Sequence, residues 1–375
     1  GGQPLPLTIT IEEALAHRAG LGDGFPPLRT SLHLLWLWFL ERETHFFFVA
    51  CRFVERMRPQ WAPGTYARYH MISFSWWVYG IVQQFCGLHI GDFVNSEIPT
   101  RLDVLGELFI GHVPPSQHNR ICPLQAQAYL DTLRDTFTTT YDYVVNARWR
   151  QRQEERKAQA IYEGVDLDGG ARSTACFEQE GFSKLPSMRQ PFEWIFLVRC
   201  YLFWFWTILL VNVAESVVMV AFWNARKMKN FCLPSSNAFC SAKAAARLYS
   251  CLATDGSVEG HRVYKESTVR ALQERIKCNP CVPSPDGPAR DTLGFSPWTN
   301  IFDGRSPTVI SHNSVGGNAV FGDPANGLSV AVIKNWYRPS VTRGGNVNSK
   351  VVDTICQIIR DHYKVEHPPS REGGA

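Results

Sequence analysis

The first clear signal along the chain is a short stretch in which apolar residues recur at helical spacing. Residues 8–17 read TITIEEALAH, and Thr10 stands three positions before Glu13, which is the spacing of a capping box. Gly20 follows directly and ends the predicted helix. Residues 59–69 (PQWAPGTYARY) then combine proline, glycine and aromatic residues, which predicts a turn-rich connection.

Longer apolar stretches predict that most of the N-terminal two thirds is helical. Residues 31–57 are rich in Leu, Trp and Phe, and residues 73–87 are uncharged, so both predict buried helices. Residues 124–161 predict a long helix that ends in a charged run (RWRQRQEERKAQ). Such a run is typical of a solvated face, because its glutamates dilute the positive charge that a nucleic acid would need. Residues 163–190 predict an irregular inserted loop.

The C-terminal part changes to the period of β-strands. Residues 308–312, 316–321 and 328–334 each predict a strand, and the Asp-Pro-Ala-Asn-Gly sequence between the last two is a strong hairpin signal. Residues 347–363 place Val and Ile on one face and predict a closing helix. We therefore expect an antiparallel sheet that is completed by segments distant in the sequence.

One apolar stretch raises the question of a membrane. Residues 200–214 (CYLFWFWTILLVNVA) carry no charge and lie between Arg199 and Glu215. These fifteen residues fall short of the ~20 that a helix needs to span a bilayer. An extension to Trp223 would place Glu215 inside the hydrocarbon, which is costly. The stretch therefore predicts a buried or surface-seeking helix rather than a span, and its aromatic content leaves peripheral membrane contact as an alternative.

Composition narrows the class of protein. Of 375 residues, 45% are hydrophobic and 19% are charged, which excludes a wholly disordered chain. A net charge of +4 is small for this length, so we expect no nucleic-acid partner. Eleven cysteines, an odd number, and no visible signal peptide favour reduced thiols and an intracellular location.

The sequence shows no metal signature. The C-x-x-C at residues 278–281 lacks the second ligand pair that a zinc site would need. His33, His45 and His89 are isolated, and we interpret them as structural. No phosphate-binding glycine loop occurs either. The sequence therefore predicts neither a metal nor a cofactor.

Four segments, taken in order, resemble motifs of the serine β-lactamase-related family, which includes class C β-lactamases, penicillin-binding proteins and esterases. They are an H-x-(A/S)-G-L segment, a P-G-T…Y segment, a helix and a strand pair, in residues 10–21, 61–76, 233–253 and 312–328 respectively. No single segment is decisive, but chance similarity is improbable for all four in this order and spacing. The resemblance implies an α+β fold (an α/β-type sandwich) of the β-lactamase/transpeptidase type. Its antiparallel sheet would be flanked by helices and joined by a helical subdomain.

The resemblance also implies one domain over residues 1–365. Its parts would be a helical part with the Tyr motif, a divergent aromatic-rich insert, a second helical part, and the C-terminal strands with their closing helix, at residues 8–130, 131–230, 231–275 and 300–365. Residues 366–375 would form a disordered tail.

The chemistry implied by the family is hydrolysis of amides or esters through an acyl-serine intermediate. The family takes its nucleophile from an S-x-x-K motif, in which one helical turn places Lys beside Ser. No Ser here has Lys three positions later. Ser267 has Arg270, which stays protonated and cannot act as a base. In the family this motif precedes H-x-(A/S)-G-L, and only about nine residues precede that segment here, so we expect a chain that begins after the nucleophile.

Two side chains stand where the family has its other catalytic groups. Tyr69 follows the P-G-T motif at the position of the catalytic Tyr, where a phenol near an ammonium group can serve as a base. His312 stands on the edge strand that faces substrate. By position, Ser314, Val315 and Gly316 would bind substrate, and Val315 would offer an oxyanion-hole N–H. The alternatives are a structural Tyr and a plain strand-end His.

The sequence departs from the family's pattern at two places. Met71 stands where the family has Asn two residues after the Tyr, and Ser314 adds a side chain where Gly would let substrate approach closely. His17 and its neighbours up to Leu21 are interpreted as stabilising a loop near the site, with no chemical role.

The sequence thus favours a serine-hydrolase-like domain that is inactive as this chain stands because it lacks the Ser-Lys motif. A small-molecule amide or ester would be the substrate if an upstream segment supplied the nucleophile. The alternative is a non-catalytic binding or scaffold protein, and a third reading adds membrane association through residues 200–223.

Overall fold

The computed structural model describes residues 9–21, 33–34, 36, 38, 40, 42–70, 73–126, 133, 136–137, 191–278, 281–282, 289–290, 293–298, 308–314, 318–337 and 354–362. The helices are α1 (Ile11–Leu15), α3 (Glu43–Glu55), α4 (Phe74–Cys86), α5 (Ile90–Arg101), η1 (Pro115–Arg120), α9 (Pro191–Asn224), α10 (Arg226–Asn230), α11 (Ala242–Ala253) and α12 (Glu266–Cys278). The strands are β1 (Leu108–Ile110), β2 (Gln125–Ala126), β3 (Ala238–Cys240), β4 (Ser257–Val258), β5 (His261–Arg262), β6 (Cys281–Val282), β7 (Ala289–Arg290), β8 (Ser296–Trp298), β9 (Val309–Asn313), β10 (Ala319–Asp323), β11 (Leu328–Val332) and β12 (Trp336–Tyr337).

The C-terminal strands form a four-stranded antiparallel sheet in the order β11-β10-β9-β8. The predicted strands at 308–312 and 328–334 are confirmed, and the turn between β10 and β11 ends at Gly327, whose φ of +61° suits glycine. Register places Val320 of β10 opposite His312 of β9. The sequence did not predict β8. It contains Pro297, which a strand tolerates at the edge of a sheet.

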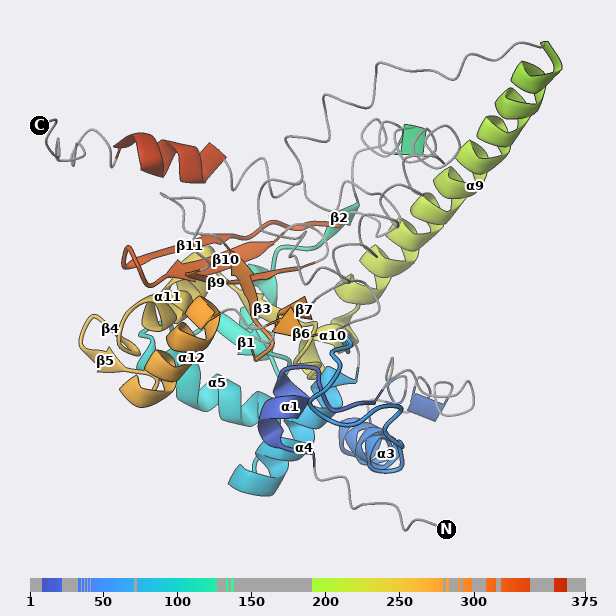
Figure 1. Cartoon of the computed structure of the whole chain (residues 1–375). Helices are drawn as coiled ribbons and strands as arrows, with labels where there is room; N and C mark the ends of the chain where they lie inside the picture. The colour runs from blue at the N-terminus through green and yellow to red at the C-terminus, as the bar shows by residue number, and fades with distance from the viewer. Residues whose placement is uncertain are drawn as a thin grey trace, which may run out of the picture.

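Helices α11 and α12 lie along one face of this sheet (Figure 1). On one face, Ile310 packs with buried side chains of α11 and α12, namely Tyr249, Leu252, Val269, Leu272 and Ile276. On the other face, Val309 and Phe321 pack with Cys356 from the helical residues 354–362. The predicted closing helix is confirmed over those residues.

The N-terminal part is helical, as predicted. The capping box of α1 is present, since the Glu13 N–H donates to Thr10 Oγ1 at 3.1 Å and the Thr10 N–H donates to Glu13 Oε2 at 2.8 Å. The apolar stretches at 31–57 and 73–87 form α3 and α4 in their described residues, and α4 ends at Gly87 in the left-handed conformation. Their core consists of Leu34, Phe46, Phe47, Ala50, Trp76 and Phe231.

Strands interrupt two stretches that were expected to be helical, and the helix expected over residues 124–161 is wrong at its N-terminal end. Residues 124–161 begin with strand β2, which pairs in parallel with β12; the Asn224 side chain both donates to the Leu124 carbonyl and accepts from its N–H. These long-range partners replace the helical hydrogen bonds there, and nearly all the rest of that stretch lies outside the described residues. In residues 231–275, β3 pairs with β1 and the β4–β5 hairpin separates α11 from α12.

The apolar stretch at 200–214 lies within α9, a helix of 34 residues. This helix extends away from the sheet and from the helices that pack on it (Figure 1). Large apolar side chains are exposed along it: Leu202, Phe203, Trp206, Leu210, Val213, Val217 and Val218. This exposure agrees with the surface-seeking alternative for that face. Among the described helices, none combines the length and apolarity that crossing a membrane requires.

Candidate active site

His17 lies at the centre of a cluster that joins three distant segments. It follows α1 and has a φ of +59°, a left-handed conformation that turns the chain sharply. Its ring stacks on His70, with 5.8 Å between ring centroids, and contacts Phe74 at 4.9 Å. The ring also lies 4.7 Å from that of Tyr69, centroid to centroid, so His17 contacts the residue that the P-G-T…Y motif singles out.

His17 accepts hydrogen bonds from the backbone on both sides of Tyr69. The Arg68 N–H donates to the His17 carbonyl at 3.0 Å, and the His70 N–H donates to His17 Nδ1 at 3.2 Å. Because Nδ1 accepts a hydrogen bond, the proton of the neutral ring resides on Nε2. His17 is therefore a neutral imidazole whose contacts fix the backbone on each side of the tyrosine.

The same two motif segments are joined further along. The Arg18 guanidinium donates to the Gly64 carbonyl through Nε at 3.0 Å and through Nη2, and the Gly64 N–H donates to the Arg18 carbonyl at 2.9 Å. Gly20 has a φ of +77°, and a Cβ there would clash with the Trp61 carbonyl oxygen. The glycines of H-x-A-G-L and P-G-T are thus explained by the close approach of these segments, which places Tyr69 beside His17.

Tyr69 itself is 63% exposed. The protein atoms packed around its ring raise the pKa of the phenol by desolvation. A general base would need a lowered pKa, which the ammonium group of the family's Lys would supply. In the described residues the environment of Tyr69 favours the neutral phenol instead.

His312 lies near this cluster, on the sheet. The expectation that it stands on an edge strand is wrong, because its strand β9 pairs with both β10 and β8. His312 is half-buried, and burial lowers its pKa. Burial, together with the charges of His70 and His312, lowers the pKa of His17 to about 3. His17 thus contacts Tyr69, and His312 is close enough for its charge to act on the His17 ring. Ser314 is exposed at the end of β9, where its N–H donates to the Asn318 carbonyl at 2.9 Å, while Val315 and Gly316 lie outside the described residues.

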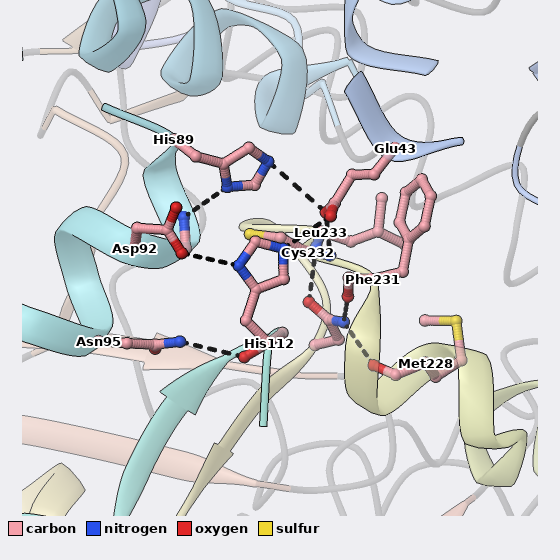
Figure 2. A network of polar contacts seen from close by, with 12 residues as sticks. Glu43, His89, Asp92, Asn95, His112, Met228, Phe231, Cys232 and Leu233 are labelled. Carbon is pink, nitrogen blue, oxygen red and sulfur yellow. Dashed lines mark hydrogen bonds and ion pairs between the residues drawn. The ribbon is translucent and has the colours of Figure 1, made fainter. Parts of the chain in front are cut away.

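A second polar cluster lies between α3, α5 and the turn after β1 (Figure 2). We call it the Glu43 network. His112 Nε2 contacts Glu43 Oε2 at 2.6 Å, and His112 Nδ1 contacts Asp92 Oδ1 at 2.9 Å. His89 Nε2 lies 3.6 Å from Glu43 Oε1, which also accepts the Cys232 N–H at 2.5 Å.

Electrostatics in this network follow from its carboxylates. The hydrogen bond to Glu43, together with that to Asp92 and the charges of both carboxylates, raises the pKa of His112 to about 9 against the opposing effect of burial. Burial lowers the pKa of His89, which caps α5 by accepting the Gly91 N–H at Nδ1. The interpretation of His89 as isolated is therefore wrong, because the fold brings it together with His112 and Glu43.

Sequence reasoning singled out Tyr69 and His312 as candidates but gave His17 no chemical role. The motif H-x-A-G-L could have indicated a role for His17, because a His at the end of a short helix can pack against the P-G-T…Y segment. The Glu43 network had no local signal. Glu43 and His112 are 69 residues apart, and metal-ligand patterns in sequence depend on short spacings.

Comparison with known families gives the class of protein. The family model described as Beta-lactamase matches residues 4–348. The chain therefore belongs to the β-lactamase family, as the four motifs predicted. Among curated proteins, no sequence matches the chain significantly.

Solved structures show the same fold. A penicillin-binding protein homologue from Caulobacter crescentus superposes with a TM-score of 0.54 at 19% identity, covering 95% of this chain and 71% of its own. A family VIII carboxylesterase gives a TM-score of 0.55 at 15% identity, covering 93% and 71%. EstA from Arthrobacter nitroguajacolicus Rue61a gives 0.53 at 14% identity, covering 94% and 73%. The predicted β-lactamase/transpeptidase-like α+β fold is confirmed.

Proposed function

We propose that this chain carries the tyrosine–histidine part of an acyl-serine hydrolase site for small esters or amides, and does not turn such substrates over by itself. The observation that carries the proposal is the ring contact between His17 and Tyr69, with His312 near enough on β9 for its charge to act on His17. A His on the sheet and an exposed phenol, each near His17, suit the binding of a carbonyl substrate, since both can offer hydrogen-bond donors.

Two facts support the absence of turnover. The 375 residues contain no S-x-x-K motif, and a site without its nucleophile loses many orders of magnitude in rate. The pKa of Tyr69 is raised, so its phenolate is scarce near neutral pH. The chain would then bind a substrate-like molecule and leave it intact.

Labelling with a fluorescent penicillin and with a fluorophosphonate tests this proposal. We expect no covalent label that survives denaturation, and no hydrolysis of a p-nitrophenyl ester above that of the heat-denatured chain. We also expect the fluorescent penicillin to bind reversibly, with affinity reduced by Tyr69→Phe and His312→Ala. Tyr66→Phe is the control, because Tyr66 packs on Trp61 outside the cluster. Covalent labelling, or hydrolysis abolished by Tyr69→Phe, would contradict the proposal.

A second candidate function is peripheral membrane binding through α9, as the sequence suggested. Its exposed apolar residues recur every three or four positions and so share one face: Phe203, Trp206, Leu210, Val213 and Val217. The basic residues of α10 follow directly and would contact anionic headgroups. Aromatic side chains with adjacent Lys and Arg are typical of interfacial helices.

Co-sedimentation with phosphatidylcholine/phosphatidylserine vesicles tests this candidate. We expect the chain to pellet with the vesicles and the double variant Trp206→Glu/Leu210→Glu to bind at least about tenfold more weakly, because two large apolar side chains no longer enter the interface. Leu105→Glu is the matched control, since Leu105 is 70% exposed but lies outside α9. Equal binding by the double variant and the control would exclude α9 as the contact surface.

A further inference from the structure

The Glu43 network holds donor atoms of the kinds that transition metals prefer. Among the described residues, Glu43, His89 and His112 are the one group of three that places a ligand atom from each side chain within 4.8 Å of the others. The side chains come from the first turn of α3, the N-cap of α5 and the turn after β1. All three are partly buried.

We propose that Glu43, His89 and His112 form a binding site for a divalent transition cation of the zinc type. Two imidazoles and one carboxylate are a ligand set that Zn²⁺ uses, with a fourth position left to water. Mg²⁺ and Ca²⁺ prefer oxygen ligands alone and fit this set poorly.

The distances suit such an ion with small side-chain adjustments. Tetrahedral bonds of ~2.0–2.1 Å place ligand atoms ~3.4 Å apart. Glu43 would turn its carboxylate to present one oxygen to the ion, because its two contacts now use different atoms. Oε1 lies 3.6 Å from His89 Nε2, and Oε2 lies 2.6 Å from His112 Nε2 with a proton between them. The cation would replace that proton, which leaves to solvent, and the two atoms would separate by less than one ångström.

The surroundings orient His112 as a ligand. Its Nδ1–H donates to Asp92 Oδ1 at 2.9 Å, and metal-binding histidines commonly donate their second N–H to a carboxylate. His112 has a φ of +46°, and such strained residues concentrate at functional sites. The preceding Gly111 also has a positive φ, and a Cβ there would lie 2.6 Å from the backbone of Cys232. Asn95 fixes this turn by donating to the Gly111 carbonyl at 3.1 Å (Figure 2).

His89 has to change its proton position to bind the cation. Nδ1 now accepts the Gly91 N–H at 3.1 Å, so the ring proton resides on Nε2. Coordination through Nε2 moves that proton to Nδ1 and gives up the cap of α5. The site would thus bind its cation chiefly through Glu43 and His112, with His89 as the third ligand.

Equilibrium dialysis against Zn²⁺, with the bound metal measured by mass spectrometry, tests the site. We expect about one zinc per chain, retained in a large excess of Mg²⁺. His112→Gln and Glu43→Gln should each weaken binding at least about tenfold, and Asp92→Asn by a similar or smaller factor. His45→Gln is the matched control, because His45 is exposed on α3 two residues from Glu43. Zinc should raise the melting temperature of the wild type and of His45→Gln but not that of His112→Gln.

Three outcomes would overturn the proposal. They are a wild-type chain that retains no zinc, equal retention by the ligand variants and the control, which would indicate an adventitious ion only, and displacement of zinc by Mg²⁺. Glu43→Gln could fail to fold, since Glu43 also accepts the Cys232 N–H. His112→Gln and Asp92→Asn then decide the question together; Asp92 is 64% exposed, so its replacement spares the core.

Discussion

Replacing His17 by Asn should remove much of the chain's sensitivity to acid. Burial lowers the pKa of His17 to about 3 in the folded chain, against 6.5 for an unperturbed His. Between these two pH values, His17 therefore binds a proton in the unfolded chain but not in the folded chain. The stability that His17 contributes is complete above pH 6.5 and is lost as the pH falls from there towards 3. At pH 4.5 the loss is on the order of 2–3 kcal/mol, since each unit of difference is worth about 1.4 kcal/mol.

Asn is the appropriate replacement because it tolerates the left-handed backbone that His17 adopts. The titratable groups that face His17 are Tyr69 and His70 from the motif segment and His312 from β9. At pH 7 we expect the His17→Asn variant to be less stable than wild type, because the ring contacts are lost. The difference in unfolding free energy between variant and wild type should then shrink or reverse by pH 4.5. At that pH the wild type is destabilised because its folded state keeps His17 unprotonated, whereas the variant has no such group.

Urea unfolding at pH 7.0, 5.5 and 4.5, followed by tryptophan fluorescence, measures this difference. His261→Asn is the control, because His261 is exposed on β5 and should change stability equally little at each pH. Parallel pH profiles for wild type and His17→Asn would show that His17 is not the buried neutral imidazole of the structure.

The parts of the fold that could be predicted are those specified by local sequence. The capping box of α1 and the β10–β11 hairpin each depend on a few neighbouring residues, so their patterns are legible. Strand β2 could not be predicted, because it pairs with the distant strand β12. Leu124, just before β2, is held by Asn224, which is 100 residues away in sequence. Strand β8 contains a proline and pairs only along one side, and neither property shows in a hydrophobic pattern.

The same distinction applies to the sites. Tyr69 and His312 were found through motifs, whereas the role of His17 depends on hydrogen bonds to the backbone on each side of Tyr69, which no side-chain pattern encodes. The Glu43 network depends on two successive left-handed residues, Gly111 and His112, that turn the imidazole towards α3. Such a turn is set by packing against Cys232 rather than by residues near His112 in sequence.

Adding a single methyl group at Gly322 should destabilise the whole chain. Gly322 lies in β10, where α11 crosses the sheet, and a Cβ there would lie 2.5 Å from the Tyr249 carbonyl oxygen and 3.3 Å from Ala253 Cβ. The nearer atom belongs to the helix backbone, which cannot rotate away as a side chain would. Gly322→Ala would therefore push α11 off the sheet, and we expect a loss of about 3 kcal/mol, at the upper end for overpacking.

Gly80→Ala is the matched control for this prediction. Gly80 lies within α4, and a Cβ there would meet Cys51 Sγ at 3.7 Å, an ordinary contact. Because Ala is favoured over Gly in a helix by about 0.5–1 kcal/mol, this variant should gain stability. The same chemical change thus has opposite signs at the two positions, and urea unfolding of both variants measures it. A Gly322→Ala variant as stable as wild type would mean that α11 does not approach β10 this closely. The position of α11 over β9 and β10, and so over the strand that carries His312, would then be wrong.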